Sequence, residues 1–228
     1  AAPLQPFIHP FTALSFTAAA TDKILLGTGI TLIAQRNAVV LAKETASVDQ
    51  LSKGRLLFGI GAGYLVQEFE ALGINFEERG ARTDEYIDAI RELWTSPKPE
   101  FAGQFVNYKG IQSRPLAYQN GGPPVIVGGT SKAAYRRAIQ KGHGWYGFAL
   151  NVASSQESVD ALKTLSESTN RSTDLGELEI SITPRVPLTD EVIKQFEDMG
   201  VSRLILLQTG QNEDQMLGYI DQIAKDFL

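Results

Sequence analysis

Short apolar runs alternate along the chain with longer segments in which apolar residues recur every three or four positions. Six of the runs have the length of strands, are rich in leucine or β-branched residues, and are apolar at consecutive positions. This pattern is typical of strands buried on both faces of a parallel sheet. The predicted strands are Ile24–Ile33, Leu56–Ile60, Val125–Val127, Trp145–Ala149, Leu178–Ile182 and Arg203–Leu207.

Helical periodicity fills the segments between these runs. Residues 86–94 carry apolar side chains at steps of three and four, and Pro97 follows as a stop signal. Ser154 with Glu157 predicts a capping box, and Thr189 predicts the N-cap of another helix. Further helices are expected over residues 10–20, around residues 40–48, and over residues 215–228.

Repeated strand–helix units imply a parallel sheet with helices on its faces. Six strands suit an open doubly wound sheet, and they also suit an eight-unit barrel that lacks two strands at its N-terminal side. Aromatic residues and glycines between 100 and 116 interrupt the rhythm and predict a small inserted hairpin. No linker or internal repeat divides the chain, so residues 1–228 are expected to form a single domain.

Composition narrows the classes of function. The chain has 228 residues, no cysteine, two histidines and a net charge of −5. These values exclude disulfides and thiolate metal sites, leave no histidine-rich metal cluster, and argue against nucleic acid or an anionic membrane as partner. No apolar run is long enough to span a bilayer and no signal peptide is recognised, so a cytoplasmic protein that acts on small molecules is expected.

Three glycine-rich segments are the candidate sites, because glycine lets a ligand approach the backbone closely. Gly59–Tyr64 follows a predicted strand with the spacing G-x-G-x-G, which does not match the dinucleotide fingerprint, and a tight turn without a ligand is the alternative. Gly128–Ser131 combines two glycines, two hydroxyls and a helix start, which favours phosphate binding over simple capping. Gly27–Thr31 predicts either a bulge, close helix packing or a ligand near the strand.

Other polar residues give weaker signals. His9 is expected to be a surface cap, and His143 is expected to be structural. The acidic residues of the segment 68–79 are interpreted as a solvated face, and no nucleophile elbow or Walker loop is present.

An ordered set of strings resembles the bacterial luciferase-like oxidoreductase family, within it the branch that depends on the deazaflavin coenzyme F420. The likeness covers roughly residues 10–145 and is weaker towards the C-terminus. The strings are Leu26–Gly29, Leu41–Glu44, Leu51–Arg55, Gly59–Tyr64, Glu68–Gly73, Phe76–Gly80, Arg82–Glu85, Leu93–Trp94, Pro123–Gly129 and Gly144–Trp145.

The resemblance implies an α/β TIM barrel of the luciferase-like type, (β/α)8, in which the first two strands and the helix between them are absent from this sequence. The opening helix without a preceding strand is what such a loss would leave, so the sequence is expected to be part of a longer protein. Exposed sheet edges and core would make such a barrel poorly soluble.

The resemblance also implies site residues, position by position. A non-proline cis peptide at Gly29-Ile30 would back the central ring of the cofactor, Gly61, Ala62 and Gly63 match the turn against the cofactor, and Gly128, Gly129, Thr130 and Ser131 match its phosphate loop. Basic and acidic residues that some members carry at positions 62 and 64 are replaced by Ala62 and Tyr64, and His143 stands where the family usually has aspartate. The acid and the histidine that certain members use belong to the missing strands, so the catalytic residues stay unknown.

Together these observations predict a flavin- or deazaflavin-dependent oxidoreductase, with F420-dependent hydride transfer to or from a small organic substrate as the leading interpretation. The first alternative is an FMN-dependent monooxygenase that uses dioxygen. The second is a protein without catalysis that binds a flavin, or a doubly wound protein that binds a phosphorylated metabolite at Gly128–Ser131. No metal, nucleic acid or membrane is expected, and the resemblance implies a homodimer.

Overall fold

The computed structural model describes residues 7–208 and 210–227, and its central feature is a curled parallel sheet. Within these residues seven strands form the sheet, and every pairing is parallel. Six of them follow the order β1-β3-β6-β7-β8-β9, and the seventh, β2, pairs with the carboxyl-terminal part of β3. The strands are β1 (Leu26–Gly27), β2 (Thr31–Leu32), β3 (Leu56–Gly61), β6 (Val125–Gly128), β7 (Gly144–Leu150), β8 (Glu179–Pro184) and β9 (Arg203–Leu204).

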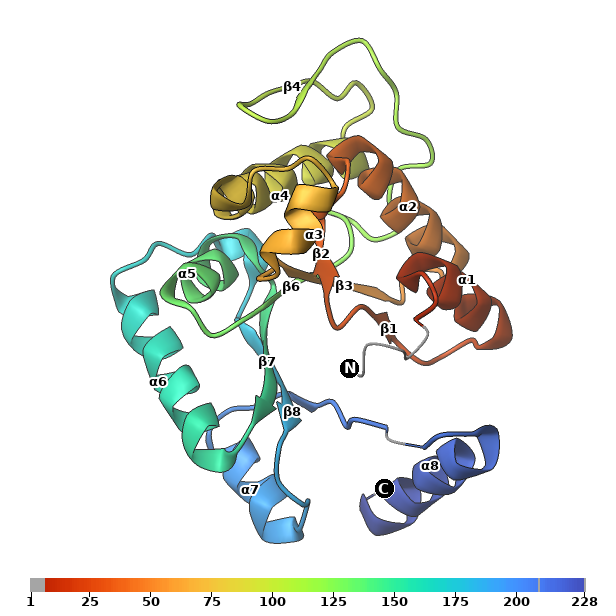
Figure 1. Ribbon diagram of the computed structural model, residues 1–228, viewed down its shortest axis with the longest axis vertical. Helices are drawn as coiled ribbons and strands as arrows, with labels where there is room; N and C mark the ends of the chain where they lie inside the picture. The colour runs from red at the N-terminus through yellow and green to blue at the C-terminus, as the bar shows by residue number, and fades with distance from the viewer. Residues whose placement is uncertain (1–6, 209, 228) are drawn as a thin grey trace.

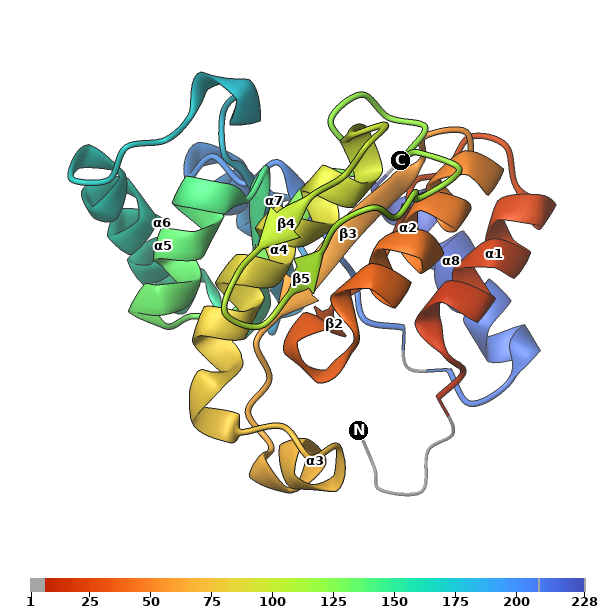
Figure 2. The same ribbon diagram turned by 90° about the horizontal axis from the view of Figure 1, so that it is seen from above.

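Helices follow the strands and lie along the convex side of the sheet (Figure 1). Their bounds are α1 (Pro10–Ala20), α2 (Ala38–Leu51), α3 (Val66–Ala71), α4 (Arg79–Thr95), α5 (Lys132–Lys141), α6 (Val152–Glu167), α7 (Asp190–Asp198) and α8 (Glu213–Phe227). In Figure 2 the short helix α3 lies beyond the carboxyl end of β3, and in Figure 1 α8 stands apart from the other helices. The predicted barrel class is therefore confirmed as a curled, open sheet with helices outside.

The predicted strand Ile24–Ile33 is wrong as one continuous strand. The structure divides it into β1 and β2, and the peptide bond between Gly29 and Ile30 is cis. The interruption brings the Thr28 hydroxyl to the carbonyl of Gly59 on β3, 2.7 Å away. The apolar pattern alone does not report such a break, because both halves still face buried surroundings.

The main core lies between the sheet and the outer helices. Phe58 of β3 packs edge-on against Trp94 of α4, with ring centroids 5.8 Å apart, and Trp145 of β7 packs against Tyr135 of α5. Phe58, Trp94 and Trp145 are each at most 2% exposed. These large aromatic side chains therefore fill the space between the sheet and the outer helices.

An antiparallel pair, β4 (Phe101–Ala102) and β5 (Asn107–Tyr108), lies within the segment where a hairpin was expected. The Glu85 carboxylate of α4 accepts hydrogen bonds from the backbone N–H groups of Gln104, Phe105 and Val106 at 2.7–2.8 Å. Tyr108 donates to the carbonyl of Ala89, also on α4. The hairpin is thereby fixed to the outside of α4 and away from the concave side.

The predicted helix caps are partly corrected. Thr189 caps α7 as expected, since its side chain accepts from the N–H of Val192. The capping box of α6 is formed by Asn151 with Ser154, so the predicted pairing of Ser154 with Glu157 is wrong by one turn. Asn is as good an N-cap as Ser, and the sequence motif alone did not distinguish the two starts. None of the helices in the described part of the chain is long and apolar enough to cross a membrane.

Candidate functional site

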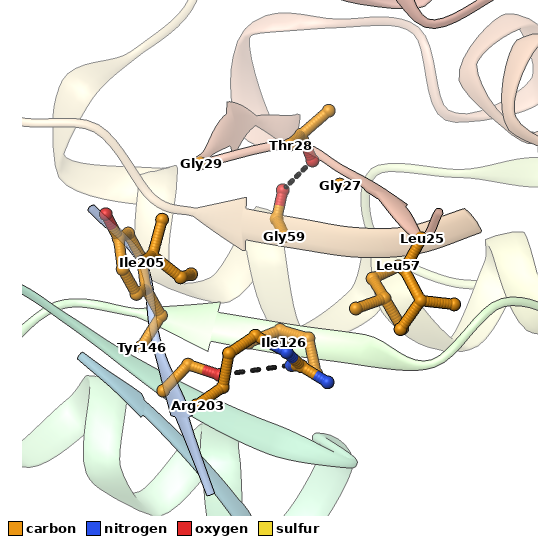
Figure 3. A pocket seen from close by; sticks show the side chains of 11 residues that line it. Leu25, Gly27, Thr28, Gly29, Leu57, Gly59, Ile126, Tyr146, Arg203 and Ile205 are labelled. Carbon is orange, nitrogen blue, oxygen red and sulfur yellow. Dashed lines mark hydrogen bonds between the residues drawn. The ribbon is translucent and has the colours of Figure 1, made fainter. Parts of the chain in front are cut away.

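A cavity of about 250 Å³ opens on the concave side of the sheet (Figure 3). It is bordered by residues of six strands and of the segments that flank them. The lining residues are Leu25, Gly27, Thr28, Gly29, Leu57, Gly59, Ile126, Tyr146, Ser181, Arg203 and Ile205. A concave, mostly apolar cavity with a few polar groups is typical of a small-molecule site.

The lining divides into two parts of different chemistry. Gly27, Gly29 and Gly59, here called the glycine wall, place backbone at the surface of the cavity. On the other side Ser181 and Arg203 lie together, with Arg203 Nη1 3.3 Å from Ser181 Oγ, and Arg203 is also paired with Glu179. The cavity therefore has glycine backbone on one side and a polar pair on the other, and apolar side chains complete the lining.

Tyr146 of β7 completes the polar side. Its hydroxyl lies 2.7 Å from Thr183 Oγ1 of β8, and either hydroxyl can be the donor. A Cβ at Gly29 would lie 3.9 Å from the hydroxyl oxygen of Tyr146, so this phenol borders the Gly29-Ile30 junction. Sequence reasoning missed Tyr146, Thr183, Ser181 and Arg203, although alternate positions of a strand that face a cavity would have suggested them.

The glycines at the end of β3 have a packing role. The space beside Gly61 is taken by the side chain of Ile30, and a Cβ at Gly59 would collide with the carbonyl oxygen of Thr28. Gly63 has a φ of +87°, and a Cβ there would press on the ring of Phe69 at 2.9 Å. Gly61, Ala62 and Gly63 lie outside the described cavity lining, next to the segment that carries Ile30.

The predicted phosphate loop lies at the carboxyl end of β6. Gly128 contacts Ile30, Gly129 has a φ of +114°, and its carbonyl accepts from Trp145 Nε1 at 2.7 Å. Ser131 caps α5 by accepting from the N–H of Ala134. Gly129, Thr130 and Ser131 are exposed, so a helix start with two hydroxyls is open to solvent.

The two histidines have structural surroundings. His143 lies at the amino end of β7, where its Nδ1 accepts from the N–H of Val125 at 3.0 Å. Burial, together with the positive charges of Arg91 and Arg171, lowers the pKa of His143 from 6.5 to about 4. His9 is exposed and its Nε2 lies 2.8 Å from Arg36 Nη1, without a capping bond from its side chain to α1.

The acidic residues of segment 68–79 have individual partners. Glu68 of α3 accepts from Gln35, and Glu78 accepts from Arg82 through two nitrogens. Arg79 lies over the ring of Phe76, 3.7 Å from its centroid. In the part of the chain that the structure describes, no group of three or more histidine, aspartate or glutamate side chains is arranged to hold a metal ion.

The fold and the cavity define an α/β protein with a curled, barrel-type parallel sheet and a cavity on its inner side. The model of the luciferase-like monooxygenase family matches residues 3–198, and the chain belongs to this family.

Two related proteins are similar in sequence to most of this chain. An uncharacterized protein of Mycobacterium tuberculosis is 24% identical over 217 residues, which cover 95% of this chain and 75% of that protein. The FMNH(2)-dependent dimethylsulfone monooxygenase of Pseudomonas putida is 26% identical over 161 residues, covering 69% of this chain and 44% of the enzyme.

Solved structures share the fold. An F420-dependent secondary alcohol dehydrogenase, solved with an F420-acetone adduct, has a TM-score of 0.78 at 16% identity. The match covers 99% of this chain and 85% of the dehydrogenase chain. The monooxygenase RslO1 of Streptomyces bottropensis has a TM-score of 0.66 at 23% identity over 96% of this chain. This chain spans 64% of RslO1 and 54% of the F420-dependent tetrahydromethanopterin reductase of Methanopyrus kandleri.

Proposed function

We propose that this chain belongs to an oxidoreductase that binds coenzyme F420 and transfers a hydride to or from a small organic substrate. The observation that carries the proposal is membership of the luciferase-like monooxygenase family over residues 3–198. The F420-dependent secondary alcohol dehydrogenase supports the choice of cofactor, because its fold matches 99% of this chain with a TM-score of 0.78.

The residues present fit such a cofactor. Gly128, Gly129, Thr130 and Ser131 offer an exposed helix start with two hydroxyls for a phosphate, where backbone N–H groups and the helix dipole favour an anion. Gly29 and Ile30, beside the concave cavity, provide backbone and an apolar side chain for a flat ring. Gly61 of β3 leaves the space that the Ile30 side chain occupies, and Ala62 and Gly63 continue the proposed turn against the cofactor. When bound, the deazaflavin supplies the hydride chemistry, and the protein supplies orientation and a site with little water.

The second candidate is an FMN-dependent monooxygenase that uses dioxygen. The dimethylsulfone monooxygenase of Pseudomonas putida favours it, at 26% identity over 161 residues. We propose further that the chain acts as a single domain over residues 1–228 and that the protein is a homodimer. Light scattering behind a sizing column measures the oligomeric state directly.

Parallel fluorescence titrations of the folded chain with F420 and with FMN test the proposal. Binding of F420 with weaker or no binding of FMN supports the hydride-transfer function. A preference for FMN moves the protein to the monooxygenase class. A chain that is folded by circular dichroism and binds neither cofactor contradicts both, and the phosphorylated-metabolite alternative at Gly128–Ser131 would then be tested with inorganic phosphate.

Thr130 offers a sharp test of the phosphate loop. Thr130→Asp places a negative charge in the loop while Ser131 still caps α5, and Thr130→Asn is a neutral control of the same shape. We expect the aspartate variant to weaken cofactor binding at least about tenfold more than the asparagine variant, because two anions repel at short range. Equal affinities of the two variants would show that the cofactor phosphate binds elsewhere.

A further inference from the structure

We propose that the hydroxyl of Tyr146 is a direct hydrogen-bonding contact to the ring of the bound flavin or deazaflavin, and that Thr183 positions it. This inference rests on the proposed function and adds to it a residue that the glycine motifs did not suggest.

Tyr146 lies where the two sides of the cavity meet. Its side chain comes from the middle of β7 and points into the cavity in Figure 3, at the side of Gly29 and Ile205. The hydroxyl oxygen would be 3.9 Å from a Cβ at Gly29, the first residue of the Gly29-Ile30 junction. The proposed ring site and the phenol are therefore immediate neighbours.

Like Tyr146, the other polar side chains of the cavity have protein partners, so position and not pairing distinguishes them. Arg203 is paired with Glu179 and bonded to Ser181 near the amino ends of β8 and β9, whereas Thr183 lies further along β8. The glycine wall offers no polar side chains. Tyr146 is thus the phenol that meets a ligand lying against that wall.

The hydroxyls of Tyr146 and Thr183 form a buried pair beside the proposed ring site. Tyr146 and Thr183 are 7% and 3% exposed, and their oxygens are 2.7 Å apart. A phenol can both donate and accept, so the Tyr146 hydroxyl can bond Thr183 and a ligand at the same time. Apolar side chains of the same shape would serve folding about equally well, so folding alone does not require this hydroxyl pair.

Fluorescence titration of Tyr146→Phe with the cofactor that the wild-type chain binds tests the inference. We expect the dissociation constant to rise about three- to tenfold, the usual effect of one lost hydrogen bond. We also expect the absorption band of the bound ring to shift relative to the wild-type complex, which a purely structural change would not cause. Tyr108→Phe is the matched control, since Tyr108 is buried and hydrogen-bonded but belongs to the outer hairpin.

Thr183 gives a second, independent measurement. Thr183→Val should weaken binding, Thr183→Ser should restore it, and the double variant with Tyr146→Phe should bind no more weakly than Tyr146→Phe alone, because the pair acts through one hydroxyl. Thermal unfolding identifies any variant that fails to fold.

The outcomes separate this inference from the proposed function. If the wild-type chain binds a cofactor while Tyr146→Phe leaves affinity and spectrum unchanged, the Tyr146 assignment is wrong and the proposed function stands. Additive effects of the Tyr146 and Thr183 substitutions would overturn the positioning role of Thr183. If the folded wild-type chain binds neither F420 nor FMN, both proposals fall together.

Discussion

The side chain of Ile30 fills the space that a side chain at Gly61 would occupy: Ile30 Cδ1 lies well inside van der Waals distance of a Cβ at Gly61. The neighbouring Gly59 faces a different obstacle, the backbone carbonyl oxygen of Thr28. A flexible side-chain end can move aside and a backbone carbonyl in a sheet cannot. The two glycines of β3 are therefore required for different reasons.

Alanine substitutions at these glycines should differ in cost and in rescue. Gly61→Ala should lower the free energy of unfolding by about 1–2 kcal/mol, and Gly59→Ala by about 3 kcal/mol or more, as overpacked sites do. The Ile30→Val background lacks Cδ1. In that background Gly61→Ala should lower the free energy of unfolding clearly less than in the wild type, while Gly59→Ala should lower it by the same amount. Urea denaturation of the four variants and their backgrounds measures this, and equal rescue at both sites would contradict the packing argument.

Glu85 should stabilise the hairpin of β4 and β5 without affecting the structure of the parallel sheet. Glu85→Ala removes the acceptor of three backbone N–H groups, at Gln104, Phe105 and Val106. We expect faster hydrogen exchange at these amides and a loss of about 1–2 kcal/mol in stability, because water replaces the carboxylate only partly. Glu100→Gln on the same hairpin is the control, since its ion pair with Lys109 is exposed and contributes below about 1 kcal/mol.

The ion pair between Arg137 and Asp84 should contribute more than surface pairs do. Arg137 of α5 bonds both carboxylate oxygens of Asp84, at 2.6 and 3.1 Å, and its side chain is 5% exposed. Asp84→Ala leaves this buried guanidinium with the carbonyl of Gly80 as its remaining partner. We expect a loss of about 2–3 kcal/mol in thermal or urea unfolding.

Asp198→Ala provides the comparison for that pair. Lys194 and Asp198 form an i,i+4 pair on α7 with side chains 71% and 64% exposed. Its loss should cost about 0.5 kcal/mol or less. A similar cost for Asp84→Ala and Asp198→Ala would show that burial of Arg137 is not what makes the first pair matter.

His143 should make the protein less stable in mild acid. Its pKa is lowered to about 4 in the folded chain and is about 6.5 when unfolded, so the unfolded chain binds more protons between these values. Stability is therefore complete above pH 6.5 and falls as the pH drops towards 4. His143→Asn keeps an acceptor for the N–H of Val125 and cannot titrate, so its unfolding midpoint should depend less on pH across this range. Parallel curves for both proteins would contradict this.

The sequence pattern was sufficient for the sheet and for most helices. Leu56–Ile60, Val125–Val127 and Leu178–Ile182 are strands in the structure nearly as expected, since their apolar runs face helices on one side and the concave side of the sheet on the other. The helix α3 and the division of Ile24–Ile33 were missed, because both depend on contacts with Phe76, Gln35 and β3 that local periodicity does not contain.

The candidate site could be proposed from the sequence only where it is built from consecutive residues. Gly128–Ser131 is a single loop, and its helix start was identified from its own glycines and hydroxyls. The hydroxyl pair of Tyr146 and Thr183 joins residues 37 positions apart, and the bond from Thr28 to Gly59 spans 31 positions. Which strands are neighbours decides such contacts, and the sheet order is a property of the whole chain.

The alternation along β3 has a consequence for how this chain tolerates change. Phe58 and Ile60 point towards the helices and are at most 2% exposed, while Gly59 and Gly61 between them point to the concave side. In a saturation mutagenesis library, positions 58 and 60 should select against smaller residues and positions 59 and 61 against larger ones. The size limits on the side chains would thus alternate between a minimum and a maximum over four consecutive codons. Evolution of a new ligand preference on this strand would have to keep that alternation.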